Sequence, residues 1–151
     1  LKEPISWIGE PLLAASVVIL VVIWVTTAFS TVVFSASLQT VPTELYEAAR
    51  VDGANAFRRF TNVTWPMIAP GLTICVTLSL ITTFKLYDII AALTGGGPFN
   101  TTESAAFYII RVAFTNNLVG YSSTIAVVLL ALTAIVSFAA SALLRRREAR
   151  I

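Results

Sequence analysis

The chain has 151 residues, of which 57% are apolar and 12% are charged, and its mean hydropathy is positive. Charged residues make up roughly a quarter of a soluble domain, so this composition excludes an ordinary soluble protein and indicates one that lies in a membrane. A lone cysteine and the absence of histidine exclude an internal disulfide, a thiolate zinc site and histidine-based acid–base chemistry, and the net charge of +2 gives no indication of nucleic-acid binding.

Long uncharged runs predict the fold class. A helix that spans a bilayer needs about 20 largely apolar residues, and three such runs predict spanning helices at about 12–37, 67–93 and 118–144. The first run has no basic flank before it and no small-residue cleavage site after it, so it is not a signal peptide. Because the chain opens on Leu1, we expect it to lack an N-terminal part. The expected fold is an all-α integral membrane protein in which residues 1–151 form part of a single transmembrane domain.

Basic residues predict how the helices are oriented. Seven of the ten Lys and Arg residues follow the first or the third span, whereas Lys2 and Arg111 lie on the opposite side. Because cytoplasmic loops carry the excess of positive charge, the segment after the first span and the C-terminus are expected in the cytoplasm. The basic C-terminal residues are expected to lie on anionic lipid.

The segment of residues 39–66, between the first two spans, is polar and rich in small residues. Pro42 is expected to end the first helix, and Thr43 is predicted to be the N-cap of a new one. Glu47 and Arg50 are spaced to form an ion pair on this helix. The residues that share one of its faces at helical spacing are Leu45, Ala48, Ala49 and Asp52.

Gly53 permits a sharp change of direction after this helix. Residues 56–60 are then predicted to form a second short amphipathic helix that ends before Pro66. Two short helices joined at a glycine would project from the membrane and could dock on another protein. An interfacial helix lying flat on lipid also suits the pattern, because Arg58 and Arg59 follow Phe57.

Charged residues reappear at the end of the second span, where Lys85 and Asp88 are three positions apart. Ionisable groups at membrane depth face a cavity or one another, so these two residues are expected either to form an ion pair or to line a path. The glycine-rich stretch 93–98 is predicted to be a turn, and it lacks the register of a phosphate loop. Residues 101–121 are expected to form an external re-entrant or interfacial helix that leads into the third span.

Four motifs, taken in order, resemble the permease subunits of carbohydrate-uptake ABC importers, and especially the maltose and glycerol-phosphate permease group. They are the loop Leu45–Pro70, the element Phe84–Asp88, the turn Leu93–Pro98, and Tyr108–Phe114 with Gly120. The resemblance implies the C-terminal half of a type I importer permease, a fold with a six-helix core. It also implies a location in the bacterial cytoplasmic (inner) membrane.

The same resemblance implies that the helix after Pro42 inserts into a groove on an ATPase subunit. The ATPase-coupling residues that it implies are Glu47, Ala48, Ala49, Asp52, Gly53 and Ala54. ATP and Mg²⁺ would then bind to a pair of ATP-binding subunits, and this chain would bind no cofactor or metal and perform no covalent chemistry. The other implied partners are a second permease subunit, a periplasmic or lipid-anchored solute-binding protein, and membrane lipid.

A substrate path is implied by the alignment with the related maltose permease. Its residues are Val25, Thr26, Phe29, Ser79, Thr83, Leu86 and Asp88. Hydroxyl groups suit the hydroxyls of a sugar, and an aromatic ring suits the face of a pyranose. Each hydroxyl could instead serve ordinary packing between helices. Leu86 replaces an amide of that relative, so the resemblance does not identify maltose as the sugar.

Two other classes of function remain open at this point. A structural or signalling membrane anchor that transports nothing would explain the hydropathy and the charge, but not the break at Gly53. An integral-membrane enzyme is less favoured, because the sequence has no histidine and no acidic pair aligned on one span.

Overall fold

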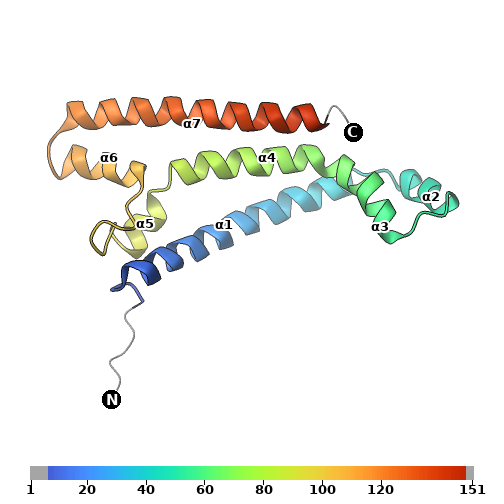
Figure 1. Cartoon of the computed structure of the whole chain (residues 1–151), viewed down its shortest axis with the longest axis horizontal. Coiled ribbons are helices and arrows are strands. Elements are labelled where there is room, and N and C mark those ends of the chain that lie inside the picture. Colours follow the sequence, from blue (N-terminus) through green and yellow to red (C-terminus); the bar gives the residue numbers. More distant parts are fainter. Residues whose placement is uncertain (1–6, 149–151) are drawn as a thin grey trace, which may run out of the picture. The chain divides into compact units, whose positions relative to one another are not determined.

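The computed structural model describes residues 7–148, and every regular element in this range is helical (Figure 1). The elements are α1 (Pro11–Gln39), α2 (Thr43–Val51), α3 (Ala56–Arg59), the π turn η1 (Phe60–Thr64), α4 (Trp65–Phe84), α5 (Asp88–Leu93), α6 (Ala105–Phe114) and α7 (Val119–Glu148). The predicted all-α fold class is confirmed.

Three helical stretches are long and apolar enough to cross a membrane: α1, the continuous run Ala56–Phe84, and α7. A helix of 29 residues, such as α1, is about 44 Å long and exceeds a hydrocarbon layer of about 30 Å. In α1 the buried residues are Ala14 and Val18, so most of its apolar surface is left uncovered. Lipid or other protein chains must therefore cover the rest.

The second long helix ends earlier than the sequence predicted. α4 stops at Phe84, and the separate helix α5 starts at Asp88, so the expected segment 67–93 is two helices rather than one. No ion pair joins Lys85 to Asp88 within the described residues, and both side chains are exposed. As the first residue of α5, Asp88 lies near the positive end of a helix dipole, which suits a carboxylate without a cationic partner.

Contacts divide the chain into two compact units. The first unit contains the chain up to Thr26 together with Leu80–Val136, and the second contains Thr27–Ser79 together with the residues from Ser137 onward. The three long helices each contribute to both units.

In the first unit, α6 and the glycine-rich turn pack around an aromatic pair. The rings of Tyr87 and Phe107 stack with 5.7 Å between centroids. Gly96 lies against the Phe107 ring, where a Cβ would come within 2.9 Å, so this position has no room for a side chain. The Ser104 hydroxyl accepts the N–H of Phe107 at 3.1 Å, which caps α6, and donates to the carbonyl of Leu86. The predicted turn is therefore a packed structure.

In the second unit, α4 approaches the end of α1 closely at Gly71. A Cβ on Gly71 would lie 2.3 Å from the Ser37 Oγ and 3.2 Å from its Cβ, so the absence of a side chain permits the contact. Two residues further on, the hydroxyl of buried Thr73 donates to the carboxylate of Glu148 at the end of α7. The first half of α4 is therefore held by both neighbouring helices.

Candidate functional site

The first helix of the segment between the two spans, α2, is started by a proline. Pro42 occupies the N-cap position with φ −61° and ψ 135°, and no side chain caps the helix. The prediction that Thr43 would be the N-cap is wrong, and Thr43 is the first helical residue. The reason is that the fixed φ of proline suits this extended position, and its missing N–H leaves no donor unpaired. Glu44 in the first turn and Arg50 in the last turn both complement the helix dipole.

Gly53 ends α2 with a well-defined hydrogen-bonded cap. Its φ is +72°, in the left-handed region that favours glycine. The N–H of Gly53 donates to the carbonyl of Arg50 at 3.0 Å, and the N–H of Ala54 donates to the carbonyl of Ala49 at 2.9 Å. This pair of bonds is a Schellman motif, which satisfies the last carbonyls of the helix and reverses the chain. The predicted change of direction at Gly53 is confirmed.

The next helix, α3, starts at an N-cap that was not predicted and runs further than expected. The Asn55 side chain accepts the N–H of Arg58 at 2.8 Å. The helix does not end before Pro66, because η1 carries it directly into α4. In η1 the N–H of Trp65 bonds to the carbonyl of Phe60, five residues back. The π turn places Pro66 in the first turn of α4, where a missing N–H is tolerated.

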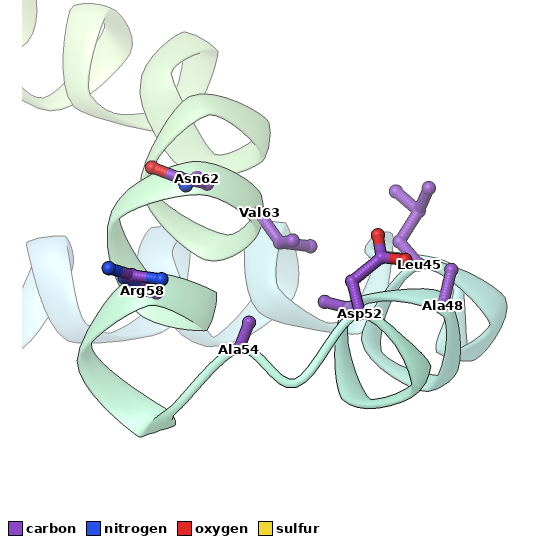
Figure 2. Close-up of a pocket in the computed structure, with 8 residues that line it drawn as sticks. Leu45, Ala48, Asp52, Ala54, Arg58, Asn62 and Val63 are labelled. Atoms are coloured by element: carbon purple, nitrogen blue, oxygen red, sulfur yellow. The ribbon is translucent and has the colours of Figure 1, made fainter.

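A groove of about 400 Å³ lies between α2 and the α3–η1 helix (Figure 2). Most of its lining is small or apolar, and Figure 2 shows Asp52 of α2 and Arg58 of α3 on its two sides. The lining residues are Leu45, Ala48, Ala49, Asp52, Ala54, Arg58, Asn62 and Val63. Such a groove fits a protruding apolar side chain whose neighbours carry charge of either sign.

The structure separates the six predicted coupling residues into two groups. The four that line the groove are Ala48, Ala49, Asp52 and Ala54. Glu47 is exposed on another side of α2, and Gly53 shapes the backbone at its end. The expected ion pair between Glu47 and Arg50 is not formed in the described part of the chain, where both side chains are exposed and a pair would gain little.

A hydrogen bond between two hydroxyl groups ties α2 to the end of η1. The Tyr46 Oη lies 2.9 Å from the Thr64 Oγ1, and both side chains are half-buried, whereas most of their neighbours are exposed. Helical periodicity could not predict this bond, because it relates residues within one helix and these two lie on either side of the Gly53 turn.

The residues of the implied substrate path belong to both units. Val25, Thr26, Thr83, Leu86 and Asp88 lie in the first unit, and Phe29 and Ser79 lie in the second.

Their surroundings in the chain are mostly open. Val25 and Phe29 are 57% and 47% exposed, whereas the Thr26 hydroxyl donates to the Val22 carbonyl of its own helix at 2.7 Å. Thr83 and Asp88 are exposed as well. The path therefore stays a prediction.

A polar cluster that the sequence did not reveal organises the outer part of the first unit. Arg111 of α6 forms an ion pair with Glu103 at 2.9 Å and donates to the Asn100 side chain at 2.8 Å. Its guanidinium also lies 5.5 Å from the centre of the Tyr108 ring. The Glu103 side chain is 10% exposed and that of Arg111 is 32% exposed. This cluster anchors the turn before α6 to the helix itself.

Comparison with known proteins adds to this geometry. Residues 4–149 match the family described as binding-protein-dependent transport system inner membrane component. The chain is 36% identical over 146 residues to the sulfoquinovosyl glycerol transport system permease protein of Agrobacterium fabrum, a match that covers 97% of this chain. It is 41% identical over 102 residues, or 68% of the chain, to the trehalose/maltose transport system permease protein of Thermococcus litoralis.

A third relative broadens the range of solutes. The osmoprotective compounds uptake permease protein of Synechocystis is 37% identical over 129 residues, or 85% of this chain. The chain spans 47%, 35% and 46% of the length of these three relatives, taken in the order given.

Proposed function

Because this chain belongs to the family of binding-protein-dependent transport system inner membrane components, we propose that it is part of a permease subunit that moves a sugar across the cytoplasmic membrane. With three helices long and apolar enough to cross a bilayer, the chain is an integral membrane protein. Two of the three relatives described above are named for sugar-containing solutes, which supports a sugar as the cargo. The names of these relatives favour transport over a non-transporting anchor and over an enzyme.

The observation that carries the proposal is the segment from α2 to η1. None of the residues of α2, α3 and η1 is buried, although the segment lies between two membrane-length helices. A fully exposed helix pair with a capped turn and a preformed groove is suited to contact with another protein rather than to packing within this chain. That partner is an ATPase subunit, and the groove takes one of its side chains.

The work of transport is divided between several subunits. A pair of ATP-binding subunits binds ATP and Mg²⁺ and closes on hydrolysis-competent ATP, and α2 passes that movement to the membrane helices. A second permease subunit completes the path, and a periplasmic or lipid-anchored solute-binding protein delivers the sugar. This chain itself performs no covalent step.

The positive charges support a cytoplasmic position for α2 and for the end of α7. Arg145–Arg147 lie in the last turn of α7, and Arg50, Arg58 and Arg59 lie in the α2–α3 segment. An excess of Arg on one side is the strongest sequence indicator of the cytoplasmic face. The Arg111 cluster and the glycine-rich turn then face outward.

Within the membrane, the sugar passes along the seven residues of the predicted path. Thr26 keeps acceptor capacity for a sugar hydroxyl, because its own hydroxyl proton is directed to Val22. The exposed ring of Phe29 offers a flat apolar face for a pyranose.

Cysteine crosslinking in the assembled full-length complex tests the contact with the ATPase. Cysteines replace Ala48 and Ala49 on the wall of the groove, one at a time, in a background where the buried Cys75 is changed to Ala. Both are expected to crosslink to an ATP-binding subunit. A matched cysteine at exposed Asn116, at the other end of the membrane helices, is expected to give none. Failure of both groove cysteines to reach that subunit would refute the proposal.

A further inference from the structure

The bond between Tyr46 and Thr64 joins two elements that are otherwise connected only through the turn at Gly53. Tyr46 lies in the first half of α2, and Thr64 is the last residue of η1, directly before α4. The other printed bonds of the segment are local: the Schellman bonds at Gly53 and the Asn55 cap each join residues three to five positions apart. The hydroxyl pair is therefore a tertiary tie between α2 and the base of a membrane-length helix.

The base of α4 is also the place where this helix is most able to bend. A π turn replaces the regular α-helical bonds there, and Pro66 removes a donor one residue after Trp65. Both features weaken the hydrogen-bond ladder locally, and kinks in helices concentrate at such positions. A displacement applied at Thr64 therefore acts directly on the deformable point, without having to pass through the chain around Gly53.

We propose that the Tyr46–Thr64 hydrogen bond is the strut that passes a movement of α2 to α4. The proposal rests on the function given above, in which α2 is moved by an ATPase. Tyr46 and Thr64 are positioning residues: neither lines the groove, and neither is exposed enough to serve as the main contact with a partner. Without the bond, α2 could still dock, but its movement would be taken up by the turn.

Two substitutions remove the bond with minimal change of shape. Tyr46→Phe deletes one hydroxyl and keeps the ring, and Thr64→Val deletes the other and keeps the β-branched form. Thr64→Ser keeps the hydroxyl and is the conservative rescue. Thr61→Val is the matched control, because the Thr61 hydroxyl lies in the same π turn but bonds to the Phe57 and Arg58 carbonyls of its own helix.

The readout is a spin label on α4 in the reconstituted full-length complex. The label is attached to Ile74→Cys, an exposed position on α4, in the Cys75→Ala background. Its spectrum is compared without nucleotide and with Mg-ATP and vanadate, and ATP hydrolysis and subunit assembly are measured on the same samples. This readout needs no knowledge of the sugar.

In the Tyr46→Phe and Thr64→Val variants, we expect normal assembly and ATP hydrolysis, with the nucleotide-induced spectral change reduced about three- to tenfold, the range that the net effect of one hydrogen bond allows. The double variant should be no worse than either single one, since both remove the same bond. Thr64→Ser and Thr61→Val should match the wild type.

Three results would overturn the strut. They are a full spectral change in Tyr46→Phe and Thr64→Val, an equal loss in Thr64→Ser and Thr64→Val, and multiplication of the two effects in the double variant. A wild-type complex that assembles with ATP-binding subunits but shows no nucleotide-dependent change at Ile74 would instead overturn the proposed function, and the strut with it.

Discussion

Gly53 determines the geometry of the proposed contact surface through its backbone alone. A Cβ at this position would meet nothing within 4 Å, so space is not what requires glycine. The requirement comes from φ, which at +72° suits glycine and, less well, asparagine. The direction in which α3 leaves α2 therefore depends on one dihedral angle.

Gly53→Pro is expected to abolish coupling while the protein still inserts into the membrane. Proline cannot adopt this φ, and it removes the N–H that bonds to Arg50. Gly53→Asn tolerates the left-handed region and is expected to retain most activity. Sugar uptake and ATP hydrolysis by the reconstituted full-length complex measure the effect. Normal uptake with Gly53→Pro would show that the turn plays no part in coupling.

Glu47→Lys is expected to weaken binding of the ATPase without affecting the stability of the permease. The Glu47 side chain is exposed and has no partner among residues 7–148, so its reversal breaks nothing within the chain. Loss of a charged hot spot at an interface costs on the order of 2 kcal/mol, which lowers affinity tens-fold. Copurification of the ATP-binding subunit checks this. Glu44→Lys, also exposed on α2, is the matched control, and an equal loss there would indicate a general charge effect.

At the scale of elements, α4 is the helix on which the contacts of the second unit converge. It meets α1 at Gly71 and α7 through Thr73, and Tyr46 of α2 reaches the residue directly before its start. The first of these contacts depends on close approach, because Gly71 leaves no space between the two helices. Packing of this kind is typical of helix pairs in membranes, where small residues let backbones come together.

Gly71→Val is expected to lower the stability of the folded protein by about 1–3 kcal/mol, because the added side chain overlaps Ser37. Gly120→Ala is the matched control: Gly120 is also helical, but its Cβ would meet nothing within 4 Å, so no loss is expected there. The midpoint of thermal unfolding in detergent measures both. If Ser37→Gly failed to restore part of the stability of Gly71→Val, the overlap would not be the cause.

The Glu103–Arg111 pair is expected to hold the turn before α6 in place. Arg111→Ala leaves a nearly buried carboxylate without its partner, which costs about 2 kcal/mol, below the value for a fully buried pair because Arg111 is one-third exposed. Unfolding in detergent measures the loss. Arg146→Ala, at an exposed position in the last turn of α7, should change nothing. A double Glu103→Gln and Arg111→Ala variant that lost the sum of the two single effects would contradict direct coupling.

At the scale of the whole molecule, the sequence predicted what periodicity and hydropathy record. The helical class followed from three apolar runs, and the shared face of Leu45, Ala48, Ala49 and Asp52 followed from helical spacing. These four residues do line one groove.

The interactions between elements could not be predicted in the same way. Glu103 precedes α6 and pairs with Arg111 across its first turns, and Tyr46 meets Thr64 only after the chain reverses at Gly53. Pro66 was taken as the end of a helix, because the π turn that accommodates it leaves no pattern in residue type.

The predicted substrate path is tested by single substitutions at four positions, Thr26→Ala, Phe29→Ala, Ser79→Ala and Thr83→Ala. A change in uptake or in the preference among labelled sugars is expected for each, with ATPase assembly retained. Leu130→Ala, an exposed position on α7 outside the predicted path, is the control. Unchanged selectivity and uptake in all four would place the sugar site in the second permease subunit instead.

The π turn makes the orientation of α4 about its own axis depend on the number of residues in one short stretch. Each residue rotates an α-helix by about 100°, and η1 fits one residue more into its turn than α spacing would. Deleting a single residue between Phe60 and Thr64 would restore regular spacing and swing every later side chain of α4 by that angle. Gly71 would then no longer face Ser37. A change in length at the cytoplasmic end, with no change in composition, would thus decide which face of the helix is turned toward its neighbours and which toward lipid.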